Sequence, residues 1–143
     1  MKRNFLMLAS VLCLLAAGAH AQSSPFVGTW HCQTTTAGSG GYAMLIDMEE
    51  VFQPDGKFSA LSSSYYTNGM ARGAQIGATQ STGTYKVDAS QGILSFHNTS
   101  SHSTNSGAAL PSDENDRFQF TSSTAFTLQS LNGGPILTFT RAQ

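Results

Sequence analysis

The chain has 143 residues, a formal net charge of −1 at neutral pH and a charged-residue content of only 10%. Its few basic residues are scattered rather than clustered. This excludes the electrostatic footprint of a nucleic-acid-binding protein and makes an acidic membrane surface an unfavourable partner. A chain of this length is sufficient for one domain with one hydrophobic core.

Residues 1–21 have the pattern of a cleavable export signal. Two basic residues near the N-terminus precede an apolar run over residues 5–17, and the Ala-His-Ala of residues 19–21 supplies the small residues that a signal peptidase requires. The apolar run is too short for a stable membrane-spanning helix. We therefore expect a signal peptide, a mature single domain over residues 22–143, a periplasmic or secreted location, and no membrane insertion after cleavage.

The mature domain keeps five basic and eight acidic residues, which gives a net charge of −3. Cys32 is its one cysteine, so no intramolecular disulfide can form and stability must come from strand pairing and the core. A single cysteine in an exported protein either pairs between chains or is buried as a small apolar residue, and we favour burial of Cys32.

The first two predicted strands cover residues 27–36 and 42–53. Alternation in the first places Trp30 on the inner face, and alternation in the second places Met48 there. The same alternation also turns Glu50 inward. Either a bulge rotates Glu50 outward, or a carboxylate lies inside the fold.

A turn at residues 53–56, Gln-Pro-Asp-Gly, leads into a third predicted strand over residues 57–67. Its inner face, from Phe58 through serines to Tyr66, is smaller and more polar than a packed core requires. Residues 68–80 are rich in glycine and small polar residues and are predicted to form a loop across a barrel mouth.

The fourth and fifth predicted strands cover residues 81–87 and 93–98. Residues 99–116 have no periodicity and are predicted to form a long loop. The acidic run at the end of this loop, Asp113, Glu114 and Asp116, lacks the spacing of a calcium loop, and we interpret it as solvated surface. Asp47 and Glu49 of the second predicted strand are also interpreted as solvated surface. The direction of Glu50 is left open.

The last three predicted strands cover residues 117–122, 125–131 and 136–141, with a turn at Asn132-Gly133-Gly134-Pro135. Eight short strands with turn signals between most neighbours predict an all-β protein. We expect an eight-stranded antiparallel up-and-down barrel, which removes exposed strand edges, with a flattened sandwich as the alternative.

Three features resemble the calycin group, which comprises lipocalins, fatty-acid-binding proteins and avidins, and most closely small lipocalin-like exported bacterial domains. They are Gly28-Thr29-Trp30 in the first strand, Arg141 near the end of the last strand, and the Pro54-Asp55-Gly56 turn before Lys57-Phe58. The resemblance implies a lipocalin-like barrel in which Arg141 packs over Trp30, so that Gly28, Trp30 and Arg141 close one end. A Thr-Asp-Tyr-like loop and the usual disulfide of true lipocalins are missing from the sequence.

The titratable residues do not form a recognisable catalytic or metal-binding motif. His31 and His97 are predicted to face outward and His102 lies in a polar loop, so the convergent ligands that zinc requires are not expected. Nucleophile-elbow and phosphate-loop patterns are missing. We expect no metal, no cofactor and no enzymatic activity; an isomerase using Glu50 and Tyr66 is a remote third option.

The predicted interior combines methionine and aromatic residues with small serines, which favours an adaptable cavity over a filled core, although a filled barrel remains an alternative. The candidate lining is Met44, Ile46, Met48, Glu50, Phe52, Phe58, Ser62, Ser64, Tyr66, Tyr85, Phe96, Phe118, Phe120 and Phe126.

The sequence supports two functions, the first from this interior and the second by analogy with the family that the chain resembles. The first is non-enzymatic binding of a small apolar or amphipathic ligand, with Glu50 contacting the ligand's polar end. The alternative is a protein-interaction module, such as a protease or lysozyme inhibitor, acting through residues 22–26 or the loop 99–116.

Overall fold

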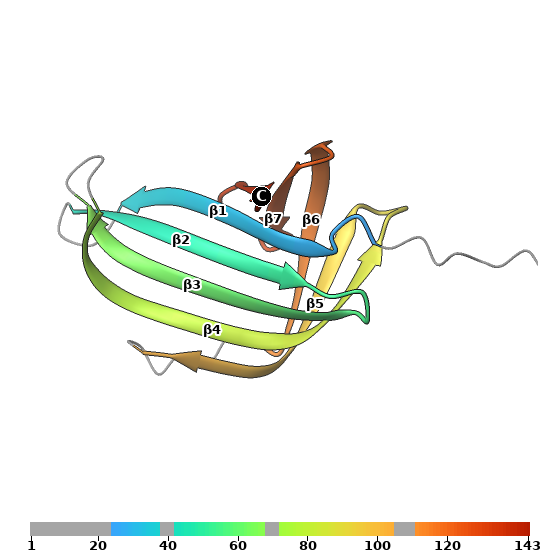
Figure 1. Cartoon of the computed structure of the whole chain (residues 1–143), viewed down its shortest axis with the longest axis horizontal. Helices are drawn as coiled ribbons and strands as arrows, with labels where there is room; N and C mark the ends of the chain where they lie inside the picture. The colour runs from blue at the N-terminus through green and yellow to red at the C-terminus, as the bar shows by residue number, and fades with distance from the viewer. Residues whose placement is uncertain (1–23, 38–41, 68–71, 105–110) are drawn as a thin grey trace, which may run out of the picture.

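The computed structural model describes residues 24–37, 42–67, 72–104 and 111–143, and these form a closed antiparallel barrel (Figure 1). Each strand pairs with its neighbours in sequence, and the last pairs with the first. This confirms the predicted up-and-down barrel, which is consistent with a calycin-like fold. No helix in the described ranges is long and apolar enough to cross a membrane. The strands are β1 (Gly28–Ala37), β2 (Ala43–Phe52), β3 (Lys57–Thr67), β4 (Arg72–Asp88), β5 (Ile93–Ser103), β6 (Asp113–Ser122), β7 (Ala125–Ser130) and β8 (Leu137–Arg141).

The barrel wall is uneven, because β6 to β8 pair with their neighbours over short distances. The strand ladder between β1 and β8 contains only the pairs Trp30–Arg141 and His31–Thr140, so most of β1 projects past β8. The pairing of β5 with β6 stops at His97, so the rest of β5 also projects. In Figure 1 the strands β1 to β5 extend to the left beyond β6 and β7. The barrel is therefore least enclosed at this end, which we call the open end.

The opposite end, where β1 begins, lies on the right of Figure 1. Buried aromatic side chains fill this end, and we call it the plugged end. Phe26 lies just before β1, is fully buried, and contacts Phe52 and Phe126 at ring-centroid distances of 5.6 and 5.0 Å. Its carbonyl accepts a hydrogen bond of 2.6 Å from the indole Nε1 of Trp30. Phe126 stacks in turn on Phe139 at 5.1 Å. The residues before β1 are therefore part of the core.

Arg141 covers the outside of this plug. Its guanidinium carbon lies 4.4 Å from the centroid of the Trp30 ring, which is a cation–π contact. Its nitrogens donate to the carbonyls of Val27 and Pro25 at 2.7 and 2.9 Å, so one side chain joins the end of β8 to the segment before β1. Gly28 lies directly beneath, with φ at +132°, and an added Cβ would come within 2.6 Å of Nη1 of Arg141. The Gly-x-Trp pattern and the distant arginine thus form one unit.

Replacing Gly28 by Ala is expected to destabilise the fold by about 2–4 kcal/mol, because the new Cβ must displace the guanidinium and the backbone is strained for an L-residue. Gly133→Ala is the matched control, since Gly133 also has a positive φ (+90°) but no atom within 4 Å of the added Cβ. The control should lose only the stability that a positive φ costs an L-residue, about 1–2 kcal/mol. Urea unfolding midpoints compare the two; equal losses would mean that the contact with Arg141 is unimportant.

Two predicted loops are largely strand. β4 begins at Arg72, so most of the predicted loop 68–80 is paired with β3, and residues 68–71 lie outside the described ranges. β5 runs to Ser103 and β6 begins at Asp113, so the predicted loop 99–116 is shortened at both ends; residues 105–110 lie outside the described ranges. These stretches approach the open end, where no face is buried in a core. The backbone ladder forms there without apolar alternation, which is why the sequence pattern missed them.

Candidate functional site: an acidic pocket in the barrel

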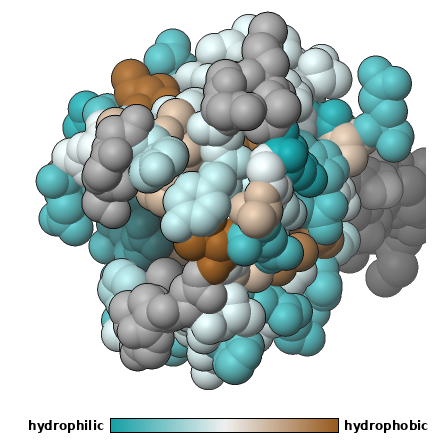
Figure 2. All heavy atoms as spheres, turned by 90° about the vertical axis from the view of Figure 1, so that its left-hand side faces the viewer, coloured by the Kyte–Doolittle hydropathy of each residue, from teal (hydrophilic) through white to brown (hydrophobic). Residues whose placement is uncertain are grey.

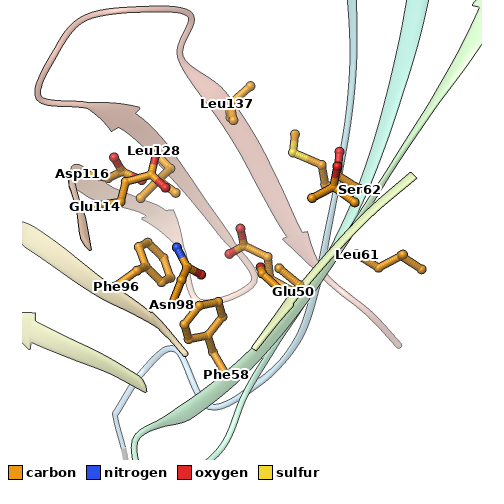
Figure 3. Close-up of a pocket in the computed structure, with 14 residues that line it drawn as sticks. Glu50, Phe58, Leu61, Ser62, Phe96, Asn98, Glu114, Asp116, Leu128 and Leu137 are labelled. Carbon is orange, nitrogen blue, oxygen red and sulfur yellow. The ribbon is translucent and has the colours of Figure 1, made fainter. Parts of the chain in front are cut away.

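A pocket of about 270 Å³ lies inside the barrel, between the plugged end and the open end (Figure 3). Every strand except β1 contributes to its walls. This volume is slightly below the usual range for small-molecule sites, so the pocket suits a small ligand. The lining residues are Met48, Glu50, Phe58, Ala60, Leu61, Ser62, Thr79, Ser81, Phe96, Asn98, Glu114, Asp116, Leu128 and Leu137.

Viewed from the open end, the surface is mixed. Figure 2 shows hydrophobic side chains between hydrophilic ones on this face. Tyr42 and Tyr66, at the adjacent ends of β2 and β3, are 64% and 50% exposed and contact each other edge to face at 6.1 Å. The open end therefore offers amphipathic side chains close to the mouth of the barrel.

Three carboxylates from opposite walls meet in the pocket. Glu50 comes from β2, and Figure 3 shows its side chain directed into the pocket, toward the side that carries Asn98, Glu114 and Asp116. Glu114 and Asp116 come from β6, two residues apart and therefore on one face of the strand. Among the described residues, no lysine, arginine or histidine lines the pocket. The site is therefore an acidic cluster with apolar neighbours.

Two carboxylate oxygens in this cluster are buried without a hydrogen-bond partner among the described residues. They are Oε2 of Glu50 and Oδ1 of Asp116. Asp116 is only 5% exposed, whereas Glu50 keeps some accessible surface along the rest of its side chain. Buried carboxylates are costly unless a donor or a cation satisfies them, so these two oxygens are free to bind a ligand.

The surroundings favour the protonated forms of both acids. Burial, together with the charges of Asp116 and Glu114, raises the pKa of Glu50 to about 8. Burial and the charge of Glu114 raise the pKa of Asp116 to about 6. At neutral pH the Glu50 carboxyl is therefore mainly protonated and can donate a hydrogen bond, while Asp116 is mainly charged and accepts.

The acidic run on β6 was predicted to be solvated surface, and for two of its members this is wrong. β6 pairs Glu114 with Phe96 and Asp116 with Leu94, which places both carboxylates on the inner face with Phe118. Only Asp113 faces outward, where it accepts from His97 at 2.8 Å. Extending the alternation of the phenylalanines backward by two and four residues would have found both acids. The assumption that charged residues are exposed overrode that pattern.

The inward direction predicted for Glu50 agrees with the structure, but the candidate lining divides into several groups. Five of the fourteen predicted residues line the acidic pocket: Met48, Glu50, Phe58, Ser62 and Phe96. Others belong to the aromatic core or pack against it: Phe52, Tyr85, Phe118, Phe120 and Phe126. Met44 and Ser64 border a separate hollow beside β4, and Ile46 is partly buried. The interior is thus filled at one end and hollow in the middle.

Tyr66 does not line the pocket as predicted. It is half exposed, whereas Thr67 next to it is buried. Tyr66 pairs with Met44 of β2 in regular register, and it lies at the open end, beyond the residues that line the pocket. The pairing of Tyr66 with Glu50 that an isomerase would need therefore lacks its geometric basis.

The remaining titratable side chains lie elsewhere. His31 contacts Glu49 at 3.5 Å and His97 contacts Asp113, all four on the outer surface. Within the described ranges, no group of three or more histidine, cysteine or acidic residues is placed to hold a metal ion. Cys32 is buried and unpaired with another cysteine, and burial raises the pKa of its thiol, which reduces its nucleophilicity.

Comparison with known proteins gives no assignment. No protein-family model matches the chain, and no curated protein is significantly similar to it.

Proposed function

We propose that this protein is an exported, non-enzymatic, lipocalin-like barrel that binds a small amphipathic molecule in the acidic pocket. The observation that carries the proposal is the combination of a plugged end, a pocket of about 270 Å³ and an open end. Apolar walls would hold the ligand's body, and Glu50 would contact its polar end. Specific ligand sites are typically apolar with a few convergent polar groups.

The inhibitor alternative receives less support from the same structure. It requires residues 22–26 or residues 99–116 as an accessible contact segment. Phe26 is fully buried in the plug, and residues 99–103 and 113–116 are paired strand. Phe26 is therefore unavailable as a contact, whereas residues 99–102 are exposed on the surface of β5 and accessible to a partner.

The proposal is tested with the small neutral apolar dye naphthalene, whose carbon skeleton matches the volume of the pocket and whose fluorescence rises in an apolar site. We expect saturable uptake by the mature protein and at least a tenfold loss of affinity in Ala60→Phe, which fills the pocket. Leu131→Phe is the matched control, because Leu131 is 50% exposed and is not among the residues that line the pocket. Thermal unfolding checks that both variants are folded.

A wild-type protein that takes up no dye, and that carries no non-covalent mass in native mass spectrometry after purification from its own compartment, would remove the proposal. Equal loss of affinity in both variants would place the dye outside the pocket and would remove it as well.

A further inference from the structure

We propose that the natural ligand is an organic cation, a small molecule with an ammonium group and an apolar body, whose charge lies between Glu50, Glu114 and Asp116. This deepens the proposed function and rests on it. The polar end of the ligand is then a positive charge, and the three carboxylates that bind it lie on facing walls of the barrel.

The charge of the pocket is complementary to a cation. Three acidic side chains line the pocket, and no basic side chain of the described residues does so. An anionic ligand would be repelled by the cluster, and a purely apolar ligand would leave the buried oxygens of Glu50 and Asp116 unsatisfied. An ammonium group carries donors that can reach both walls and a charge that offsets their repulsion.

The other walls of the pocket favour an organic cation over a metal ion. Phe58, Phe96 and Leu128 provide apolar surface next to the acids. A metal ion prefers an all-polar shell, and the described residues include no group placed to hold one. The volume of about 270 Å³ admits about ten non-hydrogen atoms, if each takes the ~30 Å³ of a water molecule in the liquid. A short arylalkyl or alkyl amine fits these limits.

The affinity for a cation depends on pH through the protonation of Glu50. The titratable or charged groups around Glu50 are Glu114 and Asp116 on β6 and Cys32 on β1; Arg141 on β8 covers the far side of Trp30, which pairs with Glu50. Because the pKa of Glu50 is raised to about 8, a bound ammonium must compete with its proton. Binding therefore releases a proton to the buffer, and affinity for the cation rises as the pH increases from about 6 to above 8.

The experiment compares 2-phenylethylammonium with 2-phenylethanol, a neutral analogue of the same size, by isothermal titration calorimetry. We expect the ammonium to bind the mature protein about tenfold or more tightly than the alcohol at pH 8.5, with this preference reduced at pH 6. Titrations in buffers of different ionisation enthalpy should show net proton release at pH 7 for the ammonium only.

Two variants distinguish binding by the carboxylates of the pocket from attraction by the overall negative charge of the protein. Glu50→Gln should lose about tenfold or more in ammonium affinity and keep its alcohol affinity. Glu49→Gln removes the same charge from the next residue, on the outer face beside His31, and should bind both compounds as the wild type does.

The outcomes distinguish the two proposals. If the dye and the alcohol bind but the ammonium has no advantage at pH 8.5, the cation assignment is wrong and the binding function stands. If the ammonium binds better but Glu50→Gln and Glu49→Gln lose affinity equally, the attraction is a property of the surface and the assignment is again wrong. If none of the three compounds binds, both proposals fail.

Discussion

Replacing Glu50 by Gln is expected to stabilise the unliganded barrel above pH 8 by on the order of 3–5 kcal/mol. The pKa of Glu50 rises from an ordinary value of 4.5 to about 8 in the folded protein. Each tenfold change in proton affinity between the folded and unfolded states corresponds to about 1.4 kcal/mol, so ionising this buried acid is expensive. Glutamine keeps the shape and the hydrogen-bonding capacity of the protonated acid and cannot ionise.

The sign follows from proton binding. Between pH 4.5 and about 8 the folded state holds the Glu50 proton, which the unfolded state has released. The free energy of unfolding must therefore fall as the pH rises through this range, and it levels off above it. Asp116 acts in the same direction between pH 3.8 and about 6. The wild type should thus be most stable in mild acid. In Glu50→Gln, the free energy of unfolding should fall much less than in the wild type as the pH rises above 6.

Urea unfolding at closely spaced pH values from 4 to 9 measures this dependence. Glu49→Gln is the control for net charge and should follow the wild-type curve, because Glu49 lies on the outer face. Parallel curves for the wild type and Glu50→Gln would show that Glu50 ionises freely in the folded protein, and the acidic pocket would then be open to bulk water.

The sequence predicted the fold where alternation and turns were strong. Met48 and Phe52 on β2 and Phe118 and Phe120 on β6 follow a strict two-residue period, and the structure places all four against the core or in the pocket. The predicted bounds failed in polar stretches near the open end, where strand pairing uses backbone groups and leaves no apolar pattern. Such strands depend on their neighbours, which one sequence does not display.

The site was only half predictable for a related reason. Glu50 was found because it interrupts an apolar face between two large residues, so alternation alone turned it inward. Glu114 and Asp116 precede the first phenylalanine of β6, and the pattern there contains only polar residues. Their burial results from the pairing of β6 with Phe96 and Leu94 on β5. Alternation counted back from Phe118 gives both acids an inward direction, but only the pairing with β5 shows that the strand extends back far enough to include them.

Replacing Phe26 by Ala is expected to destabilise the barrel by about 3–5 kcal/mol, which is as much as the loss of a central core residue. Phe26 lies outside every strand, yet it is fully buried, and its ring lies 4.9 Å from those of both Phe118 and Phe120. Truncation leaves a cavity in the plug. It also loosens the carbonyl that accepts from Trp30.

Two variants define how this loss should be interpreted. Phe26→Leu keeps most of the volume and should cost less than about 1.5 kcal/mol. Tyr42→Ala removes an aromatic ring that is 64% exposed at the open end and should change stability by no more than about 0.5 kcal/mol. Urea unfolding of the mature protein gives all three values. A small loss in Phe26→Ala would mean that the segment before β1 is a detachable lid and not part of the core. In that case the plugged end would be a second entrance to the pocket, and the assignment of the open end as the ligand's route would have to be abandoned.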